Sequence, residues 1–455
     1  MRFPSHLSGA IFLASLLGAV QTVLPAAEPL TLSQVLARAL EHNPELAIDA
    51  PIRDAAQSDL AASRAGYLPR VDFEQSYGGG DNPVYVFGTL LTQRRFTAGN
   101  FGLPSLNSPD AIDNLQTRLA AQANIWDFGR TRRRVEGARL GLEMTDRSHE
   151  DHVRQVLLAT LDAYYSVSLA REGWNAAKTS LESAESIVKQ AEARVQSGMA
   201  VEADLLRGQV YLASARHREI ETRGQLEMAQ SRLNRLMGEP VDAPLGETAA
   251  LKPASFAVAA EDALKAEQSK RRPDYLRLTA EIHQAELEVR SSQSEYLPTV
   301  GAFAAWEMDN PSLKDYGGNN WTAGVSLRWN LFAGGGDSAR LRAARQRLEA
   351  KKRQSSAMES AMALEIHNAV VQFRSAGQQV EAAQAAETQS EEGLRILKNR
   401  YEAGLATMTD VLSAESQRAA ARTMLSEAIY RHRISYAQIE YAAGILSATS
   451  PAMNP

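Results

Sequence analysis

Apolar and polar residues alternate in four short segments of the chain, most clearly at 321–332. Apolar side chains stand two residues apart there, which is the period of a β-strand with one apolar and one polar face. The apolar positions are Trp321, Ala323, Val325, Leu327, Trp329 and Leu331, and the polar ones include Thr322, Ser326, Arg328 and Asn330. Segment 114–125 alternates similarly, with Arg118 on its polar face. Two further strands are expected near 69–78 and 298–308, which makes four strands in two hairpins.

Long segments with a different period separate these strands. Apolar residues recur there at spacings of three and four, and Ala, Leu, Glu, Gln and Arg dominate, as is typical of packed amphipathic helices. Span 130–197 lacks proline and predicts one helix about 100 Å long. Span 337–402 predicts another. Helices of about half that length are expected at 33–66, 202–237, 262–294 and 406–443. Each half of the chain thus places two half-length helices end to end beside a full-length one.

The chain also contains an internal duplication. The residues Gly198, Ala200 and Asp204 return 206 positions later as Gly404, Ala406 and Asp410. The tripeptide Tyr-Leu-Pro at 67–69 returns at 296–298, an offset of 229, so 23 additional residues lie in the first half. They fall in a segment rich in Gly, Pro and Asn, which predicts a surface loop at about 81–110. We therefore expect two structural repeats, 28–250 and 251–445, and a tail at 446–455.

Composition restricts the location and chemistry of the protein. Residues 1–27 have the features of a secretory signal peptide, with Arg2, an apolar core and small residues up to Ala27. The alternative is an uncleaved anchor helix, because 3–27 contains no Asp, Glu, Lys or Arg. Cysteine is absent, which excludes disulfides and thiolate metal sites. The net charge of −5 provides no positive field for nucleic acid, and no nucleic-acid partner is expected.

Four strands are too few to close a membrane barrel. Known membrane barrels have about eight strands or more, and an open sheet edge in lipid leaves backbone groups unpaired. At least two copies must combine if the strands span a membrane, and three copies would supply twelve strands. Arg118, Arg328 and Asn330 would then line the lumen, and Trp321 and Trp329 would meet outer-membrane lipid. The alternative is a soluble periplasmic coiled-coil scaffold, because alternating strands also occur half-buried in soluble proteins.

Several motifs resemble those of the TolC-like outer-membrane efflux protein family. They are LTLSQVLARALEHNPEL at 30–46, YLP at 67 and 296, WDFGR at 126, LFAGGG at 331 and the repeated stretches at 194–206 and 400–412. The resemblance implies a mainly α-helical fold, with long antiparallel coiled coils in an α-helical barrel. It implies a homotrimer whose four strands per protomer complete a twelve-stranded β-barrel in the outer membrane of a Gram-negative bacterium. It further implies a periplasmic adaptor (membrane fusion) protein and an inner-membrane pump of RND or ABC type as partners.

The resemblance also places the closed gate at the tips of the helices. Asp204 and Asp410 are therefore the gate candidates. Thr407 predicts a helix N-cap with Asp410 at the third helical position, so a capping box is a second role for that carboxylate.

The glycines beside these carboxylates suggest the local geometry of the tips. Gly198 and Gly404 are expected to adopt φ > 0 where the chain turns back. The resemblance suggests that the small Ala200 and Ala406 leave room for an adaptor.

Motifs for catalysis, cofactors or metals do not stand out. His149 and His152 stand three residues apart, not the four of helical zinc proteases, and are assigned to a solvated helix face. We expect no enzyme and no cofactor. The favoured function is the exit duct of a tripartite efflux system that passively conducts drugs or other toxic small molecules. The duct of a type I protein secretion system is the alternative.

Overall fold

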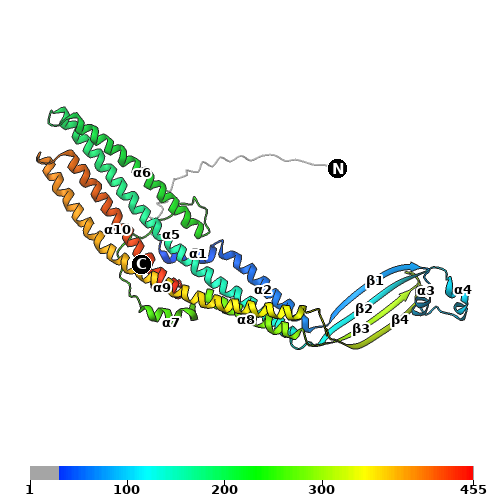
Figure 1. The fold of residues 1–455 in the computed structure, drawn as a ribbon. Helices are drawn as coiled ribbons and strands as arrows, with labels where there is room; N and C mark the ends of the chain where they lie inside the picture. The colour runs from blue at the N-terminus through cyan, green and yellow to red at the C-terminus, as the bar shows by residue number, and fades with distance from the viewer. Residues whose placement is uncertain (1–29, 454–455) are drawn as a thin grey trace, which may run out of the picture.

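The computed structural model describes residues 30–453, so the predicted signal peptide lies outside the described residues (Figure 1). A β-sheet forms one end, and long helices extend from it to two distant tips. Helices α5 (Arg130–Gln196) and α9 (Gly336–Glu402) have 67 residues each, which confirms the two full-length helices. Across residues 30–453, none of the helices has both the length and the apolar character needed to cross a membrane.

The shorter helices lie beside these two, and two of the predicted ones are interrupted. They are α1 (Leu32–His42), α2 (Asp49–Arg64), α6 (Glu202–Leu236), α7 (Glu261–Arg271), α8 (Pro273–Ser294) and α10 (Met408–Ala442). The predictions of single helices at 33–66 and 262–294 were wrong. Asn43 and Arg272 each precede a proline and have extended backbone, with ψ of 123° and 118°. Proline disfavours helical geometry in the preceding residue, which explains both breaks.

The two breaks make equivalent contacts in the two repeats. Asn43 Nδ2 donates to the carbonyl oxygen of Leu236 at 2.9 Å, at the end of α6. Arg272 Nη1 donates to the carbonyl oxygen of Ala442 at 3.3 Å, at the end of α10. Each side chain therefore satisfies a carbonyl that the last turn of the neighbouring helix leaves free. The half-length helices of each repeat are joined end to end in this way.

The main apolar core lies around this junction. It includes Leu32, Val35, Leu161 and Leu233, all almost completely buried. The Tyr164 hydroxyl, also in this core, donates to the carbonyl of Leu30 at 3.0 Å and accepts from the backbone N–H of Ala249 at 3.1 Å. One side chain thus fastens both the N-terminal segment and the linker between the repeats to α5.

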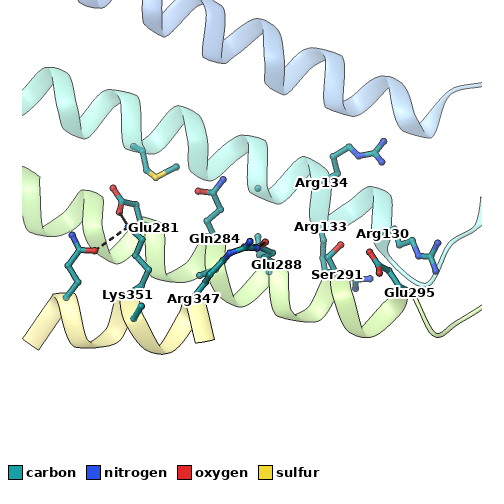
Figure 2. A pocket seen from close by; sticks show the side chains of 16 residues that line it. Arg130, Arg133, Arg134, Glu281, Gln284, Glu288, Ser291, Glu295, Arg347 and Lys351 are labelled. Atoms are coloured by element: carbon teal, nitrogen blue, oxygen red, sulfur yellow. Dashed lines mark hydrogen bonds and ion pairs between the residues drawn. The ribbon is translucent and has the colours of Figure 1, made fainter. Parts of the chain in front are cut away.

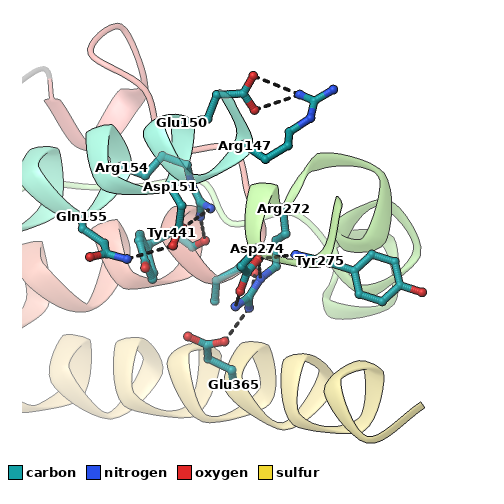
Figure 3. A network of polar contacts seen from close by, with 11 residues as sticks. Arg147, Glu150, Asp151, Arg154, Gln155, Arg272, Asp274, Tyr275, Glu365 and Tyr441 are labelled. Atoms are coloured by element: carbon teal, nitrogen blue, oxygen red, sulfur yellow. Dashed lines mark hydrogen bonds and ion pairs between the residues drawn. The ribbon is translucent and has the colours of Figure 1, made fainter. Parts of the chain in front are cut away.

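A buried polar network joins the two repeats (Figure 3). Arg154 of α5 donates to the carbonyl of Tyr441 and lies 4.6 Å from the centre of its ring. Arg272 forms ion pairs with Asp274 at 2.7 Å and with Glu365 of α9 at 2.5 Å. Burial alone would raise the pKa of Asp274, but the hydrogen bonds from Arg272 outweigh it and hold the pKa below its ordinary value. The network therefore ties α5, α8, α9 and α10 together through charged groups.

The four strands form one antiparallel sheet in the order β1-β2-β3-β4. They are β1 (Arg70–Gly80), β2 (Ile112–Trp126), β3 (Thr299–Asn310) and β4 (Gly318–Arg328). β2 pairs with β3, so the two predicted hairpins combine into a single sheet.

Strand β4 ends earlier than predicted, and the assignment of Trp329 and Asn330 to a strand was wrong. Arg328 pairs with Thr299, the first residue of β3, so residues after Arg328 have no neighbouring strand to pair with. Trp329 instead donates from Nε1 to the carbonyl of Tyr296 at 3.0 Å.

The segment between β1 and β2, predicted as a surface loop at about 81–110, is partly helical. It contains the helices α3 (Pro83–Thr92) and α4 (Leu103–Asn107). The side chain of Asn82 caps α3 by accepting from the N–H groups of Val84 and Tyr85 at 3.0 and 3.2 Å. Pro83 occupies the first turn, where its missing N–H has no consequence. Figure 1 shows both helices at the end of the sheet that is remote from the long helices.

The tail after α10 folds back over a buried carboxyl group. Glu440 is 3% exposed, and its Oε2 accepts from the backbone N–H of Ala452 at 3.3 Å. Ala452 and Met453 pack into the main core. Burial raises the pKa of Glu440 above its ordinary value, so folding favours the neutral form of this side chain.

This burial makes stability depend on pH. Because the folded-state pKa is raised, the stabilisation is complete below the ordinary range for Glu and decreases as pH rises through the folded-state value. We expect Glu440→Gln to raise the melting temperature of the purified protein at pH 8 but to change it little at pH 4. Glu427→Gln on the same helix is the control, because Glu427 is about half exposed. An equal effect of Glu440→Gln at both pH values would contradict this prediction.

Candidate functional site

The two helix tips have the same backbone geometry. Gly198 and Gly404 have φ of 73° and 75°, which confirms the predicted left-handed turns. The next residues, Met199 and Leu405, donate their N–H groups to carbonyls five residues back, each at 2.8 Å. This arrangement closes α5 and α9 with the capping pattern that favours glycine. The duplication is therefore preserved in backbone geometry at the far end of the molecule.

Asp410 caps a helix. Its Oδ2 accepts from the backbone N–H of Thr407 at 2.8 Å, and the Thr407 hydroxyl accepts from the N–H of Asp410 at 3.3 Å. The predicted capping box is confirmed. The hydrogen bonds from Thr407 lower the pKa of Asp410, so this exposed carboxylate stays charged at neutral pH.

Asp204, in the other tip, has different surroundings. Val201 provides no side-chain cap for α6. Asp204 instead forms an ion pair with Arg207 at 3.6 Å. Arg207 also donates to the hydroxyl of Thr409 at 3.4 Å, and Thr409 lies next to Asp410. The two candidate carboxylates are therefore close in the fold, and Arg207 lies between their helices.

A buried carboxylate that sequence reasoning missed also connects the tips. Glu415 of α10 is fully buried and accepts from the hydroxyl of Ser183 on α5 at 2.6 Å. It forms ion pairs with Lys398 of α9 at 2.6 Å and with Arg418 at 3.1 Å. Burial would raise the pKa of Glu415, but hydrogen bonds from Lys398 and Ser183 outweigh it and lower the pKa. In the sequence, the only sign of this site is that Glu415 departs from the repeat. The equivalent position in the first half is the neutral Gln209.

Exposed apolar side chains surround the docking candidates. Ala200 and Ala406 are half-buried, whereas Met199 and Leu405 are 74% and 69% exposed. Met199 and Leu405 occupy equivalent positions in the two repeats. Each tip therefore presents one small and one large apolar side chain to a surface.

The sheet has one apolar and one polar face. The register places these apolar side chains on one face: Val71, Phe73, Tyr77, Leu115, Leu119, Trp306, Trp321, Val325 and Leu327. The other face carries Glu74, Gln116, Arg118, Gln122, Glu307, Asp309, Ser326 and Arg328. Arg118 and Glu307 form an ion pair across β2 and β3 at 3.3 Å. Many of the apolar side chains are exposed in the single chain, Trp321 to 78%, so this face requires an apolar surrounding in the assembled protein.

A charged groove lies where the helices leave the sheet (Figure 2). It encloses about 1040 Å³ between α5, α8 and α9. Arg347 pairs with Glu288 at 2.8 Å and Lys351 pairs with Glu281 at 2.6 Å. Arg130, the first residue of α5, donates to the carbonyls of Ser294 and Leu297. These groups are satisfied by one another, so the groove belongs to helix packing.

The two histidines of α5 are not simply solvated, as the sequence suggested. His149 Nδ1 and His152 Nδ1 each lie 2.9 Å from an oxygen of Asp49, a buried residue 100 positions earlier. Burial would raise the pKa of Asp49, but the hydrogen bonds from both imidazoles outweigh it and lower the pKa. No group of three or more potential metal ligands occurs among residues 30–453.

A long helical shaft and an amphipathic sheet together define a membrane duct. The chain belongs to the family described as outer membrane efflux protein, whose model matches residues 35–239 and 266–445. It is therefore an exit duct of the Gram-negative outer membrane with a large periplasmic part, and the alternative of a soluble scaffold was wrong. Members of this family are transport ducts that work as trimers with adaptor and pump partners.

Individual relatives agree with this assignment over nearly the whole chain. The alkaline protease secretion protein AprF of Pseudomonas aeruginosa is 24% identical, covering 90% of this chain and 83% of AprF. The proteases secretion protein PrtF of Dickeya chrysanthemi is 22% identical, covering 87% of this chain and 84% of PrtF. The solved CmeC outer membrane channel of Campylobacter jejuni is 18% identical and has a TM-score of 0.80, covering 99% of this chain and 96% of CmeC. This chain and the CmeC channel therefore share the same fold.

Proposed function

We propose that three copies of this chain close one twelve-stranded barrel and one helical shaft. The observation that carries this proposal is the sheet itself, because it has an apolar face while β1 and β4 each have only one neighbouring strand. Joining β1 of one copy to β4 of the next leaves no edge exposed to lipid. Arg118 and Arg328 then face the lumen, while Trp321 faces lipid. Asn330, beyond the strand, lies at the periplasmic mouth, as does Trp329.

We propose that the helix tips form the periplasmic gate. Asp204 and Asp410 of all three copies converge there in the closed state. The contacts of Arg207 with Thr409 and of Glu415 with Ser183 and Lys398 join the two coiled coils of each copy and resist their separation. The tip turns at Gly198 and Gly404, with Ala200, Ala406 and the exposed Met199 and Leu405, are the proposed docking surface for a periplasmic adaptor.

The proposed cargo is small molecules, such as drugs or other toxic compounds, delivered by an RND or ABC pump in the inner membrane. Conduction is passive and requires no catalytic group. The family description, which names efflux, supports this cargo. The second candidate is a type I protein secretion duct, because the names of AprF and PrtF refer to protease secretion.

Deletion of the gene distinguishes the two cargoes. Efflux predicts dye accumulation and drug sensitivity in the deletion strain with an unchanged set of secreted proteins. Loss of a secreted protein without drug sensitivity would instead support secretion.

The assembly is tested on the purified protein in detergent. We expect a native mass of three chains and discrete channels in a planar lipid bilayer. A folded monomer that stays soluble without detergent, or a trimer that conducts no ions even after adaptor is added, would refute the proposal.

A further inference from the structure

The segment between β1 and β2 lies on the polar face of the sheet. The register places Gly78, Gly80 and Gly318 on the same face of the sheet as Asp309, so a Cβ on any of them would point to that face. A Cβ on Gly318 would stand 2.1 Å from the carbonyl oxygen of Thr92 in α3. A Cβ on Gly80 would stand 3.8 Å from the ring of Tyr85, also in α3. Helix α3 therefore crosses the sheet from β1 to β4 on its polar side.

Hydrogen bonds hold α3 in this position. Gln93, only 1% exposed, donates from Nε2 to the carbonyl of Asp113 at 2.8 Å and to Oδ1 of Asn114 at 3.0 Å. Asn114 in turn donates to Oδ1 of Asp309 at 2.7 Å. Arg94 donates to the carbonyl of Asn319 at 2.9 Å. The end of α3 is therefore fixed to β2 and β4 and, through Asn114, to β3.

The other side of α3 is apolar and uncovered. Val86, Thr89 and Gln93 are buried. On the opposite side, Val84, Phe87 and Leu91 are 81%, 37% and 49% exposed. A helix that is apolar all round is normally buried on every side. Phe101, 66% exposed, extends this surface, because its ring centre lies 5.1 Å from that of Phe96, which in turn lies 4.9 Å from that of Phe87. A second surface must cover it in the assembled protein.

We propose that the same surface of two other copies covers it. This inference depends on the proposed trimer, in which the polar faces of the three sheets point toward one axis. Each α3 then enters the lumen at the end remote from the long helices, with Val84, Phe87 and Leu91 toward that axis. Lipid contacts the opposite, apolar face of the sheet, so it does not cover the exposed side chains of α3. The three helices form an apolar collar at the outer mouth, and such a constriction hinders the passage of ions by excluding water.

The second repeat supplies no equivalent helix, because only residues 311–317 separate β3 from β4. Three helices rather than six therefore meet at the axis. The collar is a constriction separate from the helix tips, and it selects apolar or amphipathic cargo that can displace these side chains. Charged cargo meets a barrier at this point.

Cross-linking tests whether the three surfaces meet. The chain has no native cysteine, so Val84→Cys and Leu91→Cys each introduce one thiol per copy. Treating the purified trimer with a short bis-maleimide is expected to give covalent dimers with either variant. Val325→Cys on the apolar sheet face is the matched control and is expected to give none, because these positions face outward on different sides of the barrel. Absence of dimers with both α3 variants would overturn the collar.

Conductance tests whether the collar narrows the channel. Leu91→Asp places a charge on each α3, which hydrates the constriction. Because the tips and the collar lie in series, the change is made in an Asp410→Ala channel, where the proposed tip gate is already open, and single-channel conductance is expected to rise further. The same change at Leu313, 87% exposed on the β3–β4 turn, is the control and is expected to have little effect. An Asp410→Ala channel whose conductance Leu91→Asp does not raise would overturn the collar while leaving the duct function intact. Failure of the wild type to form a trimer would instead refute the proposed function.

Discussion

Ala323→Arg will prevent stable assembly in the outer membrane. Ala323 lies at the middle of β4 on the apolar face, level with Ala304 and Ala121 of the neighbouring strands. An arginine at the membrane midplane on the lipid face of a barrel costs about 2–4 kcal/mol. Because the proposed barrel contains three copies, this cost applies three times to one assembly. We expect the heat-resistant trimer to disappear from the membrane fraction, as measured by semi-native gel electrophoresis.

The preceding residue provides the matched control. Thr322 lies on the polar face of the same strand, so Thr322→Arg places the same side chain in the lumen. We expect normal amounts of trimer and a change in ion selectivity only. Equal loss of trimer with both variants would show that the two faces do not meet different solvents, and the proposed barrel would be wrong.

Asp410→Ala will raise channel conductance severalfold, with increased sensitivity of cells to detergents and drugs. The variant removes the proposed gate charge, but it also removes the acceptor of the Thr407 N–H. Asp410→Asn separates these roles, because it keeps an acceptor oxygen and loses only the charge. A gate that depends on charge predicts that both variants leak in planar bilayers.

Asp204→Ala is the companion variant, because Asp204 belongs to no capping box. It is expected to leak as well, since it also frees Arg207 from its ion pair. If Asp410→Ala leaks while Asp410→Asn and Asp204→Ala do not, the effect comes from the helix cap. Asp410 would then have a structural role alone.

The overall architecture was predictable because it repeats. The equivalence of Gly198 with Gly404 located both tips, and strand alternation identified both sheet faces. The helix breaks were missed because apolar periodicity continues across Asn43 and Arg272, although Pro44 and Pro273 carried the signal. The hydrogen bonds that Asn43 and Arg272 make at these breaks could not be predicted from the sequence, because the acceptor carbonyls lie about 170–190 residues away.

The functional site was only partly predictable, because some of its contacts join residues that are far apart in the sequence. Thr407 and Asp410 are three residues apart, so local spacing was enough to predict their capping box. Glu415, Ser183 and Lys398 belong to three different helices, and no pattern in one sequence places them together. Helix α3 was missed because its residues are apolar on every side, so they show no helical period.

The two ends of the duct differ in symmetry. Each chain presents two turns of nearly identical backbone geometry at the helix tips, so the proposed trimer offers six similar positions around a ring. The opposite mouth has only three, because one repeat alone carries α3. A partner that binds the ring can therefore attach in twice as many copies as a partner that binds the outer mouth. If adaptors dock at the tips as proposed, the duplication sets how many of them one duct can hold, independently of what it transports.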